Sequence, residues 1–283
     1  MRFRRTRIYS LATLIGLGCG CSRNAEHNAN ESASAHALDS TRMAPANLLA
    51  PSASAPSGTT SPGAPTDTLP TTAGAVEITP IHHAMLSFRV AGKVIYLDPT
   101  KEGITAALPK ASHIFLTDIH PDHLDLAAIE QLRLSTTIIT GPQAVADKLP
   151  GVAVLRNGEV MQMDGFSVEA IPMYNLQRGP AAGKLYHDKG RGNGYVFGFA
   201  NQRIYVSGDT ECTPEMRALR SIDVAFVCMN LPYTMPPSEA AECIRAFHPR
   251  IVYPYHYRGS DLSVLQSALA PDHSIEVRLR PWY

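Results

Sequence analysis

The alternation of apolar and polar positions predicts many short strands from Val76 onward, with a few helices between them. Short apolar runs bounded by Gly, Pro, Asn or Asp indicate strands, and apolar residues at helical spacing indicate helices. The expected strands are Val76–Ile81, Met85–Val90, Val94–Leu97, His113–Leu116, Thr137–Ile139, Val152–Leu155, Val160–Met163, Phe166–Ile171, Tyr195–Phe199, Arg203–Ser207, Val224–Val227, Ile251–Tyr253 and Ile275–Leu279. The expected helices are Leu124–Leu132, Gln143–Leu149, Pro214–Leu219, Ser238–Phe247 and Asp261–Leu269.

The order of these elements predicts the fold class. A strand-rich stretch is followed by mixed strands and helices, and the same order recurs in the second half of the chain. A regular alternation of strand and helix would instead indicate a parallel βαβ sheet. We therefore expect an α/β protein with two sheets covered by helices, a four-layer αββα sandwich, in a domain spanning residues 76–283.

The first 21 residues have the pattern of an export signal. Four arginines precede the apolar stretch Ile8–Gly18, which is too short to span a bilayer, and Cys19 and Cys21 follow. A cysteine at this place is similar to the lipid-modified cysteine of bacterial lipoproteins. We expect an exported protein of the cell envelope or periplasm, held to the membrane by a lipid anchor, with a plain secretory signal as the alternative.

Residues 22–75 differ from the rest of the chain in composition. Of these 54 residues, 37 are Ala, Ser, Thr, Pro or Gly, and none is aromatic, Val or Ile. Such a segment buries too little apolar surface to offset its chain entropy. We expect a disordered linker that connects the anchor to the domain.

Charge and cysteine content exclude several classes of protein. The chain has 25 basic and 25 acidic residues, so bulk positive charge does not favour nucleic-acid binding. Five cysteines in 283 residues are too few for a disulfide scaffold. We expect Cys212, Cys228 and Cys243 to be free thiols. The partner expected is a small-molecule substrate, and the composition leaves the oligomeric state open.

The segment Thr117–Asp125 concentrates groups that bind metals. A predicted strand ends at Thr117, and alternation along it points Asp118 and His120 the same way. Asp122 and His123 follow the break at Pro121, before the predicted helix. Nitrogen and oxygen ligands gathered this closely are typical of a two-metal hydrolytic site. The alternative is a helix cap with exposed histidines.

Four landmarks in order along the chain resemble the metallo-β-lactamase superfamily, whose signature is His-x-His-x-Asp-His at a strand–helix turn. They are Leu97-Asp98-Pro99, the segment Thr117–Asp125, Ser207-Gly208-Asp209-Thr210, and Pro254-Tyr255-His256-Tyr257. The segments Ile81–Met85 and His187–Tyr195 resemble a branch that includes ascorbate-6-phosphate lactonases and phospholipase D-like members.

The resemblance implies roles for particular side chains. His120 would bind a first metal, and Asp209 would bridge it to a second. The second metal would be held by Asp122, His123 and His256. Asp98 would lie beneath the site and orient a histidine.

Two departures from the family pattern concern the first metal. Asp118 replaces the family's first histidine, as a metal ligand or as a proton shuttle beside a single metal. An oxygen ligand would shift the preference from zinc towards manganese, iron or magnesium. The family's later histidine is also missing beside Asn175, so we expect His187 to replace it as a ligand and Asn175 to line the site.

The remaining candidates surround these ligands. We expect His83 to hydrogen-bond towards the metals, and Tyr233 and Arg258 to face substrate. Arg191 is interpreted as a solvated surface charge.

Together these features predict an exported hydrolase with one or two divalent ions, zinc by resemblance and manganese or iron otherwise. A metal-activated hydroxide would attack a lactone, ester, amide or phosphodiester, with Asp118 or Asp122 moving the proton. The alternative is an anchored, metal-binding but non-catalytic protein with a degenerate first metal site.

Overall fold

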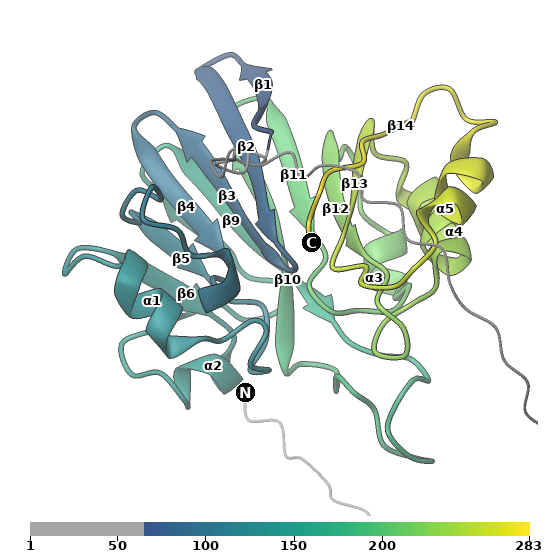
Figure 1. Cartoon of the computed structure of the whole chain (residues 1–283), viewed down its shortest axis with the longest axis horizontal. Coiled ribbons are helices and arrows are strands. Elements are labelled where there is room, and N and C mark those ends of the chain that lie inside the picture. The colour runs from purple at the N-terminus through teal and green to yellow at the C-terminus, as the bar shows by residue number, and fades with distance from the viewer. Residues whose placement is uncertain (1–64) are drawn as a thin grey trace, which may run out of the picture. The chain divides into compact units, whose positions relative to one another are not determined.

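A computed structural model describes residues 65–283, in which two sheets of seven strands each are formed (Figure 1). In the first sheet the strands follow chain order: β1 (Asp67–Thr71), β2 (Gly74–His82), β3 (Met85–Val90), β4 (Lys93–Leu97), β5 (His113–Phe115), β6 (Ile138–Gly141) and β7 (Ala153–Val154). The second sheet contains, from one edge to the other, β8 (Val160–Met163), β9 (Phe166–Met173), β10 (Gly192–Phe199), β11 (Gln202–Val206), β12 (Val224–Cys228), β13 (Ile251–Tyr255) and β14 (Glu276–Val277).

Both sheets change strand direction part-way across. Strands β1 to β4 pair antiparallel, and β4 to β7 pair parallel. The second sheet repeats this order, with β8 to β11 antiparallel and β11 to β14 parallel. The recurring pattern seen in the sequence is thus confirmed as two similar mixed sheets.

The helices fall into two groups. Figure 1 shows α1 (Leu126–Leu132) and α2 (Gln143–Ala146) beside β5 and β6, and α4 (Pro237–Phe247) and α5 (Leu262–Leu269) on the other side of the domain. The short α3 (Pro214–Arg217) and a 3-10 turn, η1 (Lys101–Gly103), complete the described elements. All five predicted helices are present, and α2 and α3 end earlier than expected.

Alternate side chains of β4 pack into two different hydrophobic cores, one on each face of the first sheet. Ile95 and Leu97 face the core that the two sheets share, whereas Val94 and Tyr96 pack with the residues of α1. Successive side chains of a strand point to opposite faces, so a strand apolar on both faces is covered on both. The expected αββα sandwich follows from this burial.

The ordered domain begins earlier than the sequence predicted. Residues 67–75 were assigned to the linker, but Asp67–Thr71 forms β1 against β2. Leu69 is buried, and Asp67 accepts hydrogen bonds from Arg280 (2.6 Å) and from the Tyr253 hydroxyl (2.9 Å). The strand was missed because its anchors lie about 200 residues away in sequence. The predicted signal peptide, and the predicted linker as far as residue 64, lie outside the described residues.

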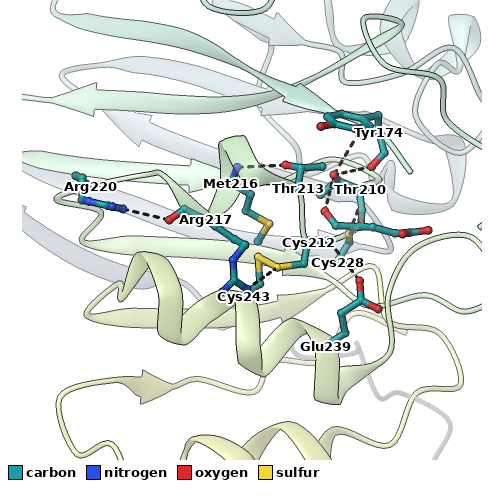
Figure 2. The surroundings of a disulfide bond; sticks show 11 residues. Tyr174, Thr210, Cys212, Thr213, Met216, Arg217, Arg220, Cys228, Glu239 and Cys243 are labelled. Atoms are coloured by element: carbon teal, nitrogen blue, oxygen red, sulfur yellow. Dashed lines mark hydrogen bonds between the residues drawn. A yellow bond between two sulfur atoms is a disulfide. The ribbon is translucent and has the colours of Figure 1, made fainter. Parts of the chain in front are cut away.

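The expectation of three free thiols was wrong for two of them. Cys212 and Cys243 form a disulfide with a Cα–Cα distance of 5.5 Å, as Figure 2 shows. It joins the segment before α3 to α4, a contact between helices that sequence spacing does not reveal. Cys228 is a free, buried thiol, as expected.

In the described part of the chain, every helix is too short or too polar to cross a membrane.

Candidate metal centre

The candidate ligands lie in the loops that directly follow strands of both sheets. Asp98 follows β4, and the segment Thr117–Asp125 runs from just after β5 to the N-cap of α1. Asp209 follows β11, and His256 follows β13. Because β4 and β5 are parallel, and β11 to β13 are also parallel, these residues come from the carboxyl ends of their strands. Open α/β sheets bind their ligands at such ends.

Three site residues have unusual backbone angles. The φ angles of Asp98, His256 and His83 are +42°, +47° and +54°. Such conformations cost about 1–3 kcal/mol each and persist only where the surroundings enforce them. Here the His83 amide donates to the Trp282 carbonyl (3.0 Å), and the His256 amide donates to the His83 carbonyl (3.2 Å). The fold therefore holds these side chains in place at an energetic cost.

Unpartnered atoms converge around Asp209. Within residues 65–283, the buried atoms His123 Nε2, His187 Nε2, His256 Nδ1 and Asp209 Oδ1 have no hydrogen-bond partner. Nε2 of His123 lies 3.4 Å from Asp209 Oδ2, and Nδ1 of His256 lies 3.2 Å from Asp209 Oδ1. Buried polar atoms are normally paired. Ligand atoms of His123, Asp209 and His256 lie within 4.8 Å of one another, so this group, called here the Asp209 cluster, fits a metal ion.

The pKa values of Asp209 and Asp122 are set by the histidines beside them. Burial by itself raises the pKa of Asp209, but His256 and His123 outweigh it and hold the pKa well below the ordinary value. Burial likewise raises the pKa of Asp122, but hydrogen bonds with His256 and His83 hold it below the usual range. Both carboxylates are therefore ionised at neutral pH, as metal ligands must be.

Asp98 lies beneath the Asp209 cluster. Its Oδ2 is 2.9 Å from His123 Nδ1 and accepts from the Thr117 hydroxyl (2.6 Å), while Oδ1 accepts from the Thr117 amide (2.8 Å). This carboxylate fixes the proton on Nδ1 of His123 and leaves Nε2 free for a metal. The structure thus places Asp98 where the orienting role requires it.

Asp122 lies at the edge of the Asp209 cluster, with 44% of its side chain exposed. Its Oδ2 is 3.1 Å from His83 Nε2 and 3.3 Å from His256 Nε2. His83 Nδ1 is in turn 2.8 Å from the hydroxyl of Tyr283. His83 therefore contacts a candidate ligand, and sequence reasoning missed the supporting tyrosine.

Asp118 is held by an arginine. Its two oxygens accept from Nε and Nη2 of Arg191 at 3.0 and 2.8 Å, and its Oδ2 is 2.9 Å from His120 Nδ1. Burial raises the pKa of Asp118, but the bond with His120 and the charges of His123 and Arg191 lower it to about 2. The interpretation of Arg191 as a solvated surface charge was wrong, because its partner is a fully buried carboxylate contributed by the other sheet.

His187 is positioned by Asn175. The Asn175 side-chain oxygen is 2.7 Å from His187 Nδ1 and also accepts from the His187 amide (2.8 Å). Nε2 of His187 therefore points towards Asp209 Oδ2, 3.4 Å away, and Asp118 Oδ2, 3.9 Å away. Ligand atoms of Asp118, His120 and His187 lie within 4.8 Å of one another and form a second group, called here the Asp118 cluster.

Sequence reasoning also missed Glu211. It is buried and accepts hydrogen bonds from the Asn175 amide group (3.0 Å) and from the backbone amides of Leu176, Gln177 and Arg178. Glu211 thereby secures the loop that carries Asn175. A carboxylate two residues after Asp209 was the available signal, but its partners come from a loop 33 to 36 residues away.

A cavity of about 560 Å³ opens over both clusters. Its walls include Tyr186, Tyr233, Leu231 and Arg258. The rings of Tyr186 and Tyr233 meet edge to face, with centroids 5.0 Å apart. Tyr233 and Arg258 both lie on the cavity wall.

Two mixed sheets with buried His and Asp ligands at their strand ends define the metallo-β-lactamase fold. Residues 77–256 match the family model described as a beta-lactamase superfamily domain. The chain belongs to this superfamily. Among its relatives are UPF0173 metal-dependent hydrolases. The one from Thermococcus onnurineus is 29% identical over 197 residues, which cover 64% of this chain and 84% of the relative. The one from Symbiobacterium thermophilum is 30% identical over 178 residues, covering 58% and 75%.

Solved structures agree with this assignment. A Parabacteroides distasonis protein, described as a metal-dependent hydrolase, is 39% identical, with a TM-score of 0.73 over 77% of this chain and 98% of its own. Igni18, a metallo hydrolase from Ignicoccus hospitalis, is 19% identical, with a TM-score of 0.60 over 72% and 94%, and shows the fold alone. The protein is therefore a metal-dependent hydrolase.

Proposed function

We propose that this protein is an exported hydrolase of small carbonyl compounds, namely lactones, esters or amides, in preference to phosphodiesters. The observation that carries the proposal is the position of the substrate cavity, which joins the Asp209 cluster to an aromatic wall. A bound divalent ion supplies a water of lowered pKa and stabilises negative charge on the attacked oxygen.

The residues around the ion have separate tasks. His123, Asp209 and His256 would hold it, and Asp98 would orient His123. Asp122 is partly exposed and on the cavity wall, so we assign to it the transfer of a proton from water to the leaving group. Asp118, the other expected proton carrier, has both oxygens bonded to Arg191 and is poorly placed for that task.

Charge in the cavity favours a substrate with little negative charge. Asp98, Asp118, Asp122 and Asp209 bring four carboxylates to the site, and Arg191 is already paired with one of them. Arg258 adds one cation to the cavity wall. With the charge of the bound ion added, Arg258 is, among the described residues, the one Lys or Arg side chain on the cavity wall, and we propose a neutral lactone or ester, or one with a single carboxylate directed at Arg258. An apolar arm would pack against Tyr186 and Tyr233.

Export is supported from two sides. The N-terminal pattern predicts a signal peptide and a lipid anchor on Cys19 or Cys21. The disulfide between Cys212 and Cys243 is a bond that persists in oxidising compartments such as the periplasm. Cell fractionation of the wild type and of Cys19→Ser and Cys21→Ser tests the anchor. Release of one variant from the membrane fraction is expected, and a wild type found in the cytoplasm would contradict export.

The catalytic proposal is tested by measuring kcat and KM of the full chain on matched substrates. An aryl-substituted lactone and an aryl ester are compared with a diaryl phosphodiester carrying the same leaving group. We expect kcat/KM for the carbonyl substrates to be higher by about tenfold or more, and Asp209→Asn to abolish it. Asp272→Asn, which changes a surface carboxylate paired with His248, is the matched control and should retain full activity.

The aromatic wall is tested separately. Tyr233→Ala should raise KM for the aryl lactone about tenfold, equivalent to about 1.4 kcal/mol of lost contact. It should leave KM for a methyl-substituted lactone nearly unchanged.

Faster turnover of the phosphodiester than of the lactone and the ester would contradict the proposed substrate class. Binding of a metal without turnover of any member of the panel would likewise contradict the proposed substrate class.

A further inference from the structure

The described chain has three groups of candidate metal ligands, and the third, His83, Asp122 and His256, shares His256 with the Asp209 cluster. The Asp209 and Asp118 clusters differ in how their polar atoms are used. In the Asp209 cluster, His123 Nε2, His256 Nδ1 and Asp209 Oδ1 lack hydrogen-bond partners within the described chain. In the Asp118 cluster, both carboxylate oxygens of Asp118 already accept charged hydrogen bonds from Arg191. The guanidinium thus occupies the carboxylate that a second ion would need.

Arg191 also reaches the next member of the Asp118 cluster. Its Nη2 lies 3.5 Å from His120 Nε2, and Nδ1 of the same ring is 2.9 Å from Asp118 Oδ2. The arginine therefore faces two of the three groups that would bind a second ion. His187 is the third group, and its free Nε2 is closer to Asp209 Oδ2 (3.4 Å) than to Asp118 Oδ2 (3.9 Å).

The backbone holds Arg191 in this place. The next residue, Gly192, begins β10, and a Cβ there would lie 2.9 Å from the Thr117 carbonyl oxygen. The Asn193 amide donates to that same carbonyl (2.9 Å). The start of β10, which directly follows Arg191, is thus docked against the residue before Asp118, and only 19% of the arginine side chain is exposed.

The chemistry of the guanidinium group explains why a metal ion would not displace Arg191 from Asp118. A guanidinium does not lose its proton under ordinary conditions, so a metal cannot displace it by deprotonation as it displaces a proton from histidine or cysteine. Its planar fork matches a carboxylate in two parallel hydrogen bonds. A dication bound to Asp118 would also lie beside this fixed positive charge and be repelled by it.

We propose that Arg191 takes the place of the second metal ion. The protein holds one ion in the Asp209 cluster, and the guanidinium supplies the positive charge at the Asp118 cluster. Asp118 is then a positioning residue for Arg191 instead of a metal ligand. The inference concerns metal number and stands whether or not the proposed substrates are correct.

The test is metal stoichiometry by native mass spectrometry on the full chain, equilibrated with excess Zn²⁺ and in parallel with Mn²⁺. The wild type should bind one ion per chain. Arg191→Ala and Arg191→Gln, which remove the charge, should bind two. Arg258→Ala is the matched control, because Arg258 lines the same cavity. It should still bind one.

A second variant locates the added ion. Combining Asp118→Asn with Arg191→Ala should return the stoichiometry to one, because the second ion depends on the Asp118 carboxylate. Native spectra report folding through the charge-state distribution, and Arg191→Gln keeps much of the side-chain volume if the alanine variant unfolds. Two ions in the wild type would overturn the proposal. One ion in both folded Arg191 variants, or two in the double variant, would also overturn it.

Discussion

The Asp209 cluster and the Asp118 cluster are built from the same kinds of residue, but their ligand atoms have different hydrogen-bond partners. Each brings together histidines and an aspartate whose ligand atoms lie within 4.8 Å of one another. Around Asp209, the neighbouring histidines lower the pKa of the carboxyl group, and one carboxylate oxygen and two histidine nitrogens have no hydrogen-bond partner in the described chain. Around Asp118, Arg191, the residue before β10, donates hydrogen bonds to both carboxylate oxygens. The number of candidate ligands therefore does not give the number of metal ions that can bind. That number depends on whether the ligand atoms already accept hydrogen bonds from other groups.

The largest effect should come from removing a ligand of the Asp209 cluster. His123→Ala should lower kcat/KM by on the order of 10³-fold, since it loses the charge stabilisation of a bound ion. Metal content by mass spectrometry should fall in parallel. His273→Ala, which changes an exposed histidine, is the control and should leave both quantities unchanged. Equal activity of the two variants would show that the Asp209 cluster is not the metal centre.

The disulfide supports the segment that carries Asp209, since Cys212 follows it by three residues. The bond closes a loop of about 31 residues, so Cys212→Ser with Cys243→Ser should lower the free energy of unfolding by about 2–4 kcal/mol. Urea unfolding of the metal-free chain measures this. Cys228→Ser changes the buried free thiol and controls for loss of a sulfur. Unchanged stability of the double variant would show that α3 and α4 are held together without the bond.

Orientation should matter less than ligation. Asp98→Asn keeps the shape of the side chain but weakens its hold on His123 Nδ1, so metal affinity should fall by about 10–100-fold. Competition with a chromophoric chelator measures the affinity. Asp118→Asn is the informative comparison, because Asp118 lies in the cluster occupied by Arg191, and it should change affinity for the first ion less than Asp98→Asn does. The reverse order would show that the first ion is bound at Asp118.

The smallest effect concerns a second Asp–Arg pair, Asp67 with Arg280, which joins β1 to the segment after β14. Burial raises the pKa of Asp67, but the hydrogen bonds from Arg280 and Tyr253 outweigh it, and the pKa lies below its ordinary value. A carboxyl with a depressed folded pKa contributes stability above its unfolded pKa, about 3.9, and loses it as the pH falls further. Asp67→Asn should therefore cost up to about 1 kcal/mol at pH 7 and little at acid pH. Thermal unfolding of both proteins at pH 7 and pH 3 checks this, and an equal deficit at the two pH values would contradict it.

Most of the fold was predictable because its signals are local. Alternation along Val94–Leu97 and the helical spacing of α4 depend on neighbouring residues alone. The strand β1 was missed because Leu69 is its single buried apolar side chain and its other anchors, Tyr253 and Arg280, are distant in sequence. The disulfide was missed for the same reason, since two cysteines 31 residues apart have no local sign of contact.

The candidate ligands could also be named in advance, since the motif around His120 and His123 and the Gly208-Asp209-Thr210 turn are contiguous in sequence. Their division into two clusters could not. It depends on Arg191, which is 73 residues from Asp118 along the chain and reaches it because β10 docks on Thr117. The support of His187 by Asn175 and Glu211 likewise crosses between loops.

The sequence by itself determined which elements form, which residue types gather at the strand ends, and which superfamily the chain resembles, because periodicity and short motifs are properties of adjacent residues. The tertiary structure alone decided which carboxylate pairs with an arginine and which histidine nitrogens stay free. These outcomes depend on distances of 2.8 to 3.9 Å between side chains from different sheets, and no local pattern specifies such distances.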